Sequence, residues 1–331
     1  MIEVAKTAAR AMAMPSFFRP MPNLVAAIFP LMKLLPALSL VEAAPKGQPI
    51  IETSSGTMGL ALASVCANRN IDLTLVTPKL EAELRIHLQA LGQTRIIEVK
   101  GDQSARLEVL DSLLERAPQQ HWTRQYDSPL VAASYAPVGV ALGELSVDVV
   151  VAAVGSGGSG CGIASAVRSY GRDCEFVAVD AQHSVLFGHA DGPRNVPGIG
   201  NSIMPGALKH EMVDQVCWVS DRLMIEAARY FAREAGIFIG PTGAACLLVA
   251  MIMAKSQPSR TIGCIVADQG HRYLRSVFAA SDANTALNMI THTKITTALA
   301  TGRLNELDID CATEDWGRRS FHQRSDCQIS S

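Results

Sequence analysis

The sequence predicts an α/β protein with two lobes, each built on a mostly parallel sheet flanked by helices. Two observations carry this prediction. Short β-rich runs alternate with longer helical patterns from about residue 45 onward, which is typical of parallel βαβ units. The 331 residues also suggest roughly two domains, at about 150 residues each. The sequence contains no internal repeat, so a solenoid or a propeller is not expected.

The strands are predicted from short runs rich in β-branched and other apolar residues, and the helices from the longer segments between them. The expected strands are 49–52, 72–76, 95–99, 147–154, 174–179, 216–219 and 261–267. The expected helices are 60–68, 80–90, 105–116, 131–144, 162–168, 221–234 and 244–254. The first 45 residues are expected to be irregular.

Residues 283–331 lose the alternation and gain Thr, Arg, Ser and Gln, so we expect a C-terminal appendage. The loop 181–205 is rich in Gly, Pro and Asn. It is too long for a plain connection and is therefore expected to line a site.

Composition argues for a small-molecule partner. Lys and Arg number 29 against 31 Asp and Glu, a net charge of −2, which offers no electrostatic case for nucleic acid or an anionic membrane. The most apolar stretch, 24–44, is interrupted by Pro30, Lys33 and Pro36, so no transmembrane anchor is expected. The eight cysteines are scattered without metal-site spacing, which favours reduced thiols in a cytoplasmic protein and no metal.

A glycine loop directly follows the strand 147–154. Gly155, Gly157 and Gly160 open a helix, and converging backbone N–H groups at a helix N-terminus can bind a phosphate without a lysine. The same spacing satisfies GxGxxG, and Asp180 ends the next strand, as a dinucleotide-binding fold requires. An NAD-dependent oxidoreductase is therefore one alternative.

Two further loops favour a ligand other than a dinucleotide. The strand 49–52 leads into the hydroxyl-rich segment 53–59, which precedes a helix and suits a carboxylate. Residues 240–245 again place a hydroxyl, that of Thr242, just before a helix. A ligand with a phosphate, a carboxylate and a ring heteroatom would use all three loops, whereas a dinucleotide would not need the last two.

Together these motifs resemble the cysteine synthase and cystathionine β-synthase family of fold-type II pyridoxal-phosphate enzymes. The likeness covers roughly residues 22–278 and rests on five motifs in the same order. They are ETSSGTMGLALA at 52–63, VGSGGSGCGIA at 154–164, PGIGNSIMP at 197–205, EAGIFIGPTGAA at 234–245 and ADQGHRYL at 267–274. The resemblance implies a two-lobed fold with pyridoxal 5′-phosphate in a cleft between the lobes. On this expectation, residues 34–145 form a smaller lobe, which is inserted into a larger lobe made of 1–33 and 146–282.

The resemblance also implies the roles of individual residues. Lys33, which lies in an apolar stretch where desolvation would lower its pKa, is expected to hold the cofactor and then act as the base. The expected cofactor-binding residues are Lys33, Thr57, Gly155, Ser156, Gly157, Gly158, Ser159 and Thr242, with Thr242 at the ring nitrogen. The expected substrate-binding residues are Thr53, Ser54, Ser55, Gly56, Thr57, Gln125 and Gly198.

The implied activity is β-elimination and β-replacement on an activated serine, O-acetyl- or O-phosphoserine, which gives cysteine or another β-substituted alanine. A neutral hydroxyl at the ring nitrogen favours loss of a β leaving group over transamination. His183, Arg194 and Asn195 could contact the leaving group or second substrate. A serine or threonine dehydratase and a noncatalytic binding module remain alternatives, and relatives of this kind pair as homodimers.

Overall fold

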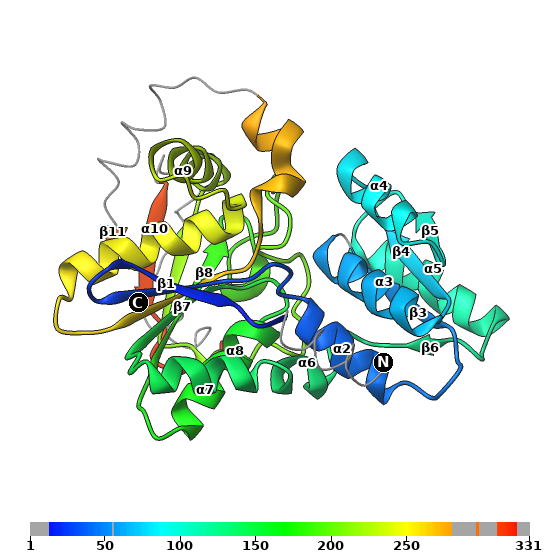
Figure 1. Cartoon of the computed structure of the whole chain (residues 1–331), viewed down its shortest axis with the longest axis horizontal. Helices are drawn as coiled ribbons and strands as arrows, with labels where there is room; N and C mark the ends of the chain where they lie inside the picture. The colour runs from blue at the N-terminus through cyan, green and yellow to red at the C-terminus, as the bar shows by residue number, and fades with distance from the viewer. Residues whose placement is uncertain (1–12, 55, 280–295, 298–309, 323–331) are drawn as a thin grey trace. The chain divides into compact units, whose positions relative to one another are not determined.

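The computed structural model describes residues 13–54, 56–279, 296–297 and 310–322. The chain divides into two compact units. Unit 1 comprises Met1–Met14 and Leu31–Ser134, and unit 2 comprises Pro15–Pro30 and Tyr135–Ser331. Each unit contains its own sheet, as Figure 1 shows.

Unit 1 is built on a parallel sheet. Among the described residues it has four strands in the order β5-β4-β3-β6, with all neighbours parallel. The two central strands are buried along their whole length, as expected where helices cover both faces of a parallel sheet. The strands are β3 (Ile50–Thr53), β4 (Leu73–Thr77), β5 (Thr94–Glu98) and β6 (His121–Trp122). The helices are α2 (Leu34–Ala43), α3 (Thr57–Arg69), α4 (Ala82–Ala90), α5 (Gln103–Arg116) and α6 (Pro129–Ala133).

Unit 2 has a larger, mixed sheet. Its described strands follow the order β1-β2-β10-β7-β8-β9-β12-β11. The central run from β2 to β9 is parallel, and antiparallel pairs flank it, β1 with β2 and β12 with β9. The strands are β1 (Ser16–Met21), β2 (Leu24–Ile28), β7 (Val149–Ala153), β8 (Glu175–Ala181), β9 (Gln215–Val219), β10 (Ile262–Val266), β11 (Thr296–Thr297) and β12 (Cys311–Asp315).

Helices cover both faces of this sheet. In Figure 1, α9 (Asp221–Glu234) and α10 (Pro241–Ser256) lie on one face, and α7 (Ala136–Glu144) and α8 (Gly158–Ser169) lie on the other. Most residues of α10 are buried, which explains why its sequence is apolar on every side. Short helical turns η1 (Val185–Phe187), η2 (His210–Met212), η3 (Gly270–Tyr273) and η4 (Leu274–Phe278) complete the unit.

The α/β fold class and every predicted strand are confirmed, with ends shifted by one or two residues. The expectation of an irregular N-terminal region was wrong for its described part, which forms β1, β2 and α2. The reason is tertiary, because β2 is a short strand that pairs in parallel with β10, more than 200 residues later. Its local sequence gives only a brief apolar run, which is weak evidence for a strand.

The expected C-terminal appendage contains an integral strand. β12 pairs with β9 over five register positions, and Trp316 beyond it is 1% exposed. Through β12 and Trp316, the tail therefore contributes to the core of unit 2. Residues 283–295, 298–309 and 323–331 of this segment lie outside the described residues.

The expected single helix 131–144 is two helices, α6 and α7. α7 packs closely on α8, because a Cβ at Gly139 would lie 2.4 Å from the Ala166 Cβ. This contact joins α7 to unit 2, whereas we had placed residues up to 145 in the smaller lobe. Among the described helices, none combines the length and the apolar character that a membrane span would need.

Candidate active site

The glycine loop after β7 is packed against the long loop that we expected to line a site. The Gly200 N–H donates to Val154 O at 2.8 Å, and Asn201 Nδ2 donates to Gly155 O at 3.2 Å. A Cβ on Gly155 would lie 3.0 Å from Gly198 O. The structure thus brings together two of the predicted site segments, 155–159 and the motif that contains Gly198.

Glycine is required in this loop because neighbouring atoms fill the space of a side chain. A Cβ on Gly157 would lie 2.6 Å from both Cα and Cβ of Leu208, and Gly157 has a φ of +79°. A Cβ on Gly160 would lie 2.3 Å from Phe176 Cζ. The backbone of the loop can therefore adopt its path only without side chains at these positions.

The start of α8 has the features of an anion site. Gly157 is the N-cap, and no side chain caps the helix there, so its first N–H groups are not satisfied by a capping side chain. Ser156, Gly158 and Ser159 lie in the same turn, and Ser159 is 8% exposed. These groups and the positive end of the helix dipole fit a phosphate.

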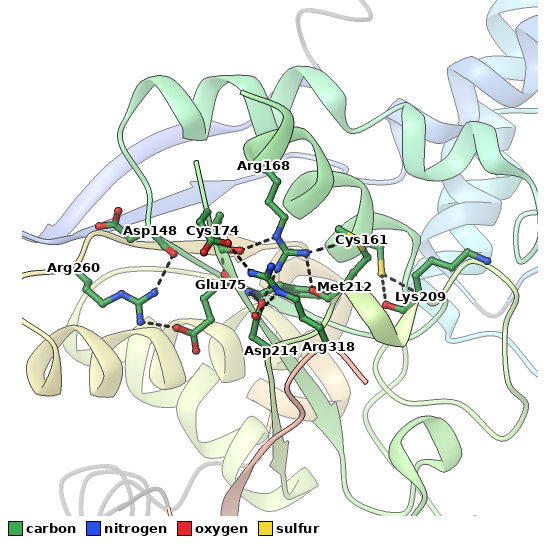
Figure 2. Close-up of polar contacts among 12 residues, drawn as sticks. Asp148, Cys161, Arg168, Cys174, Glu175, Lys209, Met212, Asp214, Arg260 and Arg318 are labelled. Carbon is green, nitrogen blue, oxygen red and sulfur yellow. Dashed lines mark hydrogen bonds and ion pairs between the residues drawn. The ribbon is translucent and has the colours of Figure 1, made fainter. Parts of the chain in front are cut away.

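The other end of α8 is held by Arg168. Its guanidinium donates to Cys174 O at 2.8 Å, to Met212 O at 3.0 Å and to Asp214 Oδ2 at 2.7 Å (Figure 2). Asp214 also accepts from Arg318 Nε at 2.7 Å, so the C-terminal segment is joined to the same cluster. Because these groups are only partly buried, the cluster fixes geometry more than it adds stability.

Near its start, α8 makes a second contact through Cys161. The Cys161 Sγ lies 3.5 Å from Lys209 N and 3.7 Å from Lys209 O (Figure 2). Burial raises the pKa of this thiol, which makes it a packing group rather than a nucleophile. The segment 208–209 is thereby held beside the glycine loop.

Thr242 lies in the first turn of α10 with a buried hydroxyl. The residue is 4% exposed, and its Oγ1 has no hydrogen-bond partner among the described residues. A buried hydroxyl without a partner costs about 1–3 kcal/mol, so its retention points to a ligand that supplies the partner.

Asp268 lies beside Thr242. Its Oδ1 accepts the Gly243 N–H at 2.7 Å. Burial raises the pKa of Asp268 to about 6, an effect that hydrogen bonds from the backbone of Gly243 and the side chain of Tyr273 oppose. The carboxyl group is therefore bound to the start of α10.

In unit 1, the hydroxyl-rich segment is shaped by Ser54. Its Oγ accepts the Gly59 N–H at 2.8 Å and the Gly56 N–H at 3.2 Å, which satisfies donors at the start of α3. Thr57 begins the helix and is partly exposed. Ser55, also predicted to bind substrate, lies outside the described residues.

Glu52 is the centre of this region, and the sequence did not identify it. The carboxylate is completely buried, and burial raises its pKa. Oε1 accepts from Thr53 N at 2.8 Å and from Trp122 Nε1 at 3.1 Å. Oε2 accepts from Thr123 Oγ1 at 2.6 Å and from Gln125 N at 3.0 Å.

These bonds bring two predicted substrate-binding residues together. Gln125 Nε2 donates to Thr53 O, and Gln103 Nε2 donates to Thr53 Oγ1 at 3.0 Å. Glu52 and Gln125 thus hold the end of β3 and the loop after β6 in one cluster, and Gln103 joins the start of α5 to it. The signal that could have found Glu52 is an acidic residue inside an otherwise apolar strand run.

Lys33 occupies the N-cap position of α2 without a capping hydrogen bond from its side chain, and it belongs to unit 1. Burial lowers the pKa of its amine to about 8, as expected for an ammonium group that is removed from water. Its apolar chain neighbours Met32 and Leu35 are 3% and 7% exposed. An amine with this pKa is partly neutral near pH 7.5 and can act as a nucleophile or base.

The structure argues against the dinucleotide alternative. Asp180 is 0% exposed, and its Oδ1 accepts the Ala181 N–H at 2.8 Å. Burial raises the pKa of Asp180 to about 8, and a fully buried carboxyl group is not accessible to a ribose. Asp180 therefore cannot take the role that a dinucleotide-binding fold gives to the acidic residue after the GxGxxG loop.

The charged and polar residues of the loop 181–205 mostly stabilise the loop itself. Arg194 donates to Ser202 Oγ at 2.6 Å, to Asp191 Oδ1 at 2.9 Å and to the His183 carbonyl. The Asn195 N–H donates to Asp221 Oδ2 at 2.5 Å. These contacts do not support a role for Arg194 or Asn195 in binding a leaving group.

Comparisons with known proteins identify the family. The family model described as "Pyridoxal-phosphate dependent enzyme" matches residues 32–268. The chain is 33% identical over 244 residues to N-(2-amino-2-carboxyethyl)-L-glutamate synthase of Ralstonia nicotianae, covering 70% of this chain and 72% of the relative. The synthase of the same name from Cupriavidus metallidurans is 30% identical over 244 residues, with 69% and 71% covered.

The fold agrees as well. The crystal structure of cysteine synthase from Entamoeba histolytica superposes with a TM-score of 0.77 at 22% identity, and the match covers 85% of this chain and 93% of that one. By family model, sequence relatives and fold, the chain belongs to the pyridoxal-phosphate-dependent enzyme family, as a fold-type II member.

Proposed function

We propose that this protein joins an activated serine to the amino group of a second amino acid, with glutamate as the first candidate. The family activity is pyridoxal-phosphate-dependent β-replacement on a serine-derived substrate. The observation that carries the finer proposal is the 33% identity to a relative named N-(2-amino-2-carboxyethyl)-L-glutamate synthase. That name describes a glutamate whose nitrogen bears the three-carbon skeleton of serine, which is the product of β-replacement by an amine.

The residues of both units fit the cofactor. The start of α8 offers N–H groups without a side-chain cap for its phosphate. For its ring nitrogen, Thr242 offers a buried hydroxyl that has no partner in the described part of the chain. Lys33 offers an amine whose pKa is lowered to about 8. When bound, the cofactor supplies the electron sink for breaking the substrate's Cα–H bond and expelling the β leaving group.

The chain's own residues would supply binding and proton transfer. Lys33 Nζ would bind the cofactor aldehyde and then accept the proton from the substrate's α-carbon. Thr53, Ser54, Ser55, Gly56 and Thr57 would bind the substrate carboxylate together with Gln125, and Gly198 would line the same site. Ser54 Oγ already accepts two N–H groups, so its contribution would be its hydroxyl proton.

The activity is tested by product mass. Purified protein with pyridoxal phosphate is given O-phospho-L-serine or O-acetyl-L-serine, and then L-glutamate or sulfide, and the products are identified by mass spectrometry. We expect the glutamate adduct with one of the two serines, and its loss in Lys33→Ala. Cysteine formed from sulfide while glutamate is ignored would favour a cysteine synthase, and pyruvate formed without a second substrate would favour a dehydratase.

Two broader expectations accompany this proposal. We expect a homodimer in the cytoplasm, because relatives of this kind pair and the cysteines have no pattern of disulfides. The described cysteines are free and buried, which is consistent with that expectation. Size-exclusion chromatography with light scattering tests the dimer.

A further inference from the structure

The helix that carries Thr242 has no cap from its own chain segment. α10 begins after Gly240, which has no side chain to accept the first backbone N–H groups, and Pro241 follows it. Uncapped N–H groups at a buried helix start need an acceptor from elsewhere. Asp268, which follows β10, supplies it through the 2.7 Å bond from Gly243 N to Oδ1.

The chain leaves room for this carboxylate at Gly240. A Cβ on Gly240 would lie 2.1 Å from Asp268 Oδ2 and 2.5 Å from its Cγ. Gly240 has a φ of −75°, a conformation that any residue adopts. The backbone therefore does not require glycine here. The Asp268 carboxylate requires it, together with the Tyr273 ring, whose Cε2 would lie 2.6 Å from the added Cβ.

The same helix turn carries a hydroxyl that lacks a partner. Thr242 lies between Gly240 and Gly243, and its Oγ1 is buried without a hydrogen bond among the described residues. A hydroxyl can meet a ligand atom only if its backbone is held within a few tenths of an ångström. From outside the helix, Asp268 holds this backbone turn through its carboxylate, which accepts the Gly243 N–H at 2.7 Å, and through its backbone carbonyl, which accepts the Gly240 N–H at 3.2 Å.

We propose that Asp268 is a positioning residue for the cofactor, which caps α10 and thereby holds Thr242 Oγ1 where it hydrogen-bonds the pyridine nitrogen. The inference rests on the proposed function, because it requires that pyridoxal phosphate binds with its ring nitrogen at Thr242. Asp268 acts through the helix turn and need not contact the cofactor. Gly240 is the second part of this arrangement, because its missing side chain provides the space.

The test measures the hydrogen bonding of the ring nitrogen directly. Each variant is reconstituted with pyridoxal phosphate labelled with ¹⁵N in the ring, and the ¹⁵N chemical shift and cofactor dissociation constant are measured. Thr242→Val provides the reference for a lost hydrogen bond. Gly240→Ala displaces the carboxylate and crowds the Tyr273 ring without backbone strain. Asp268→Ala removes the carboxylate, and Asp268→Asn keeps an oxygen that can accept from Gly243.

A matched control separates positioning from a general loss of stability. Asp102 caps α5 in unit 1 by accepting the Ala105 N–H at 3.0 Å. Asp102→Ala therefore removes a helix cap of the same chemistry outside the cofactor-binding segments. Thermal unfolding of the apo proteins measures the cost of each lost cap.

We expect Gly240→Ala and Asp268→Ala to move the ¹⁵N signal toward that of Thr242→Val and to weaken cofactor binding about tenfold, the effect of one buried hydrogen bond. Asp268→Asn and Asp102→Ala should keep the wild-type signal. The inference is overturned if Gly240→Ala and Asp268→Ala keep the wild-type signal, or if Thr242→Val itself does. A wild-type protein that takes up no cofactor would contradict the proposed function instead. If Asp268→Ala does not fold, Gly240→Ala decides alone.

Discussion

Two loops in this molecule connect a buried strand to a helix, and they are shaped by opposite means. The glycine loop after β7 has its path because side chains are absent, since Leu208 and Phe176 occupy the space that Cβ atoms would need. The hydroxyl loop after β3 has its path because buried acceptors are present, namely Glu52 and Ser54. One loop is determined by steric fit and the other by hydrogen bonds.

This difference teaches how each loop can fail. A single added methyl group should disrupt the first loop, whereas a single deleted oxygen should disrupt the second. Deleting an oxygen from the glycine loop should be milder, because that loop has no side-chain acceptor to lose. Adding a methyl group to the hydroxyl loop should also be milder, because hydrogen bonds as well as packing hold that loop. The following predictions test this contrast, beginning with the largest effect.

Glu52→Ala should have the largest effect. It leaves the N–H groups of Thr53, Trp122 and Gln125 and the Thr123 hydroxyl without their acceptor. We expect the free energy of unfolding of the apo protein to fall by about 3–5 kcal/mol in a urea titration. Trp122→Phe removes only one donor and should cost about 1 kcal/mol. Equal losses in both variants would show that Glu52 is not the centre of the cluster.

Gly157→Ala should follow. The new Cβ would lie 2.6 Å from Leu208 Cα at a φ of +79°, so overpacking and backbone strain together should cost about 3 kcal/mol. Cofactor binding should weaken because the phosphate-binding turn moves. The control is Gly171→Ala, where φ is +95° but nothing lies within 4 Å of the new Cβ. If the control is equally harmful, strain rather than close packing determines this loop.

Lys33→Met should stabilise the apo protein. Burial lowers the pKa of Lys33 from 10.5 to about 8, so below pH 8 the folded state must hold a charge that it disfavours. Because the unfolded chain binds more protons between pH 8 and 10.5, wild-type stability recovers across that range. At pH 7 we expect the variant to be more stable by about 2 kcal/mol.

This stabilising effect should disappear toward pH 10.5. Urea titrations at pH 7, 9 and 10.5 check it, and Lys46→Met at an exposed lysine is the matched control. A Lys33→Met variant no more stable than wild type at pH 7 would mean that the amine is well solvated. Unit 1, which contains the hydroxyl loop, would then not be destabilised by the amine of Lys33.

Ser54→Ala should have the smallest effect. It removes the acceptor of the Gly56 and Gly59 N–H groups, and water at the start of α3 can replace part of this. We expect a loss of about 1 kcal/mol in unfolding free energy and weaker binding of the amino-acid substrate. Ser64→Ala in the same helix, where Oγ donates to Leu60 O at 2.9 Å, should be close to neutral. If Ser54→Ala and Ser64→Ala lose the same unfolding free energy, the hydrogen bonds that Ser54 accepts have no special role at the start of α3.

Much of the fold could be predicted because its evidence is local. The strands 49–52 and 147–154 and the loops after them are visible as apolar runs followed by hydroxyl or glycine residues, and patterns within about ten residues are sufficient to detect them. β2 and β12 escaped prediction, because each is recognised only by its pairing with β10 and β9. The site shows the same division, since its loops were predicted while Glu52 and Asp268 were not.

By itself, the sequence determined the α/β class, the order of the main strands, the three loops and the lysine in an apolar stretch, because each is a property of neighbouring residues. The tertiary structure alone decided that Asp180 is buried, that Glu52 binds a loop 70 residues away and that Asp268 caps a helix which begins 27 residues before it. Burial and hydrogen-bond partners depend on which distant segments meet, and no local pattern records that.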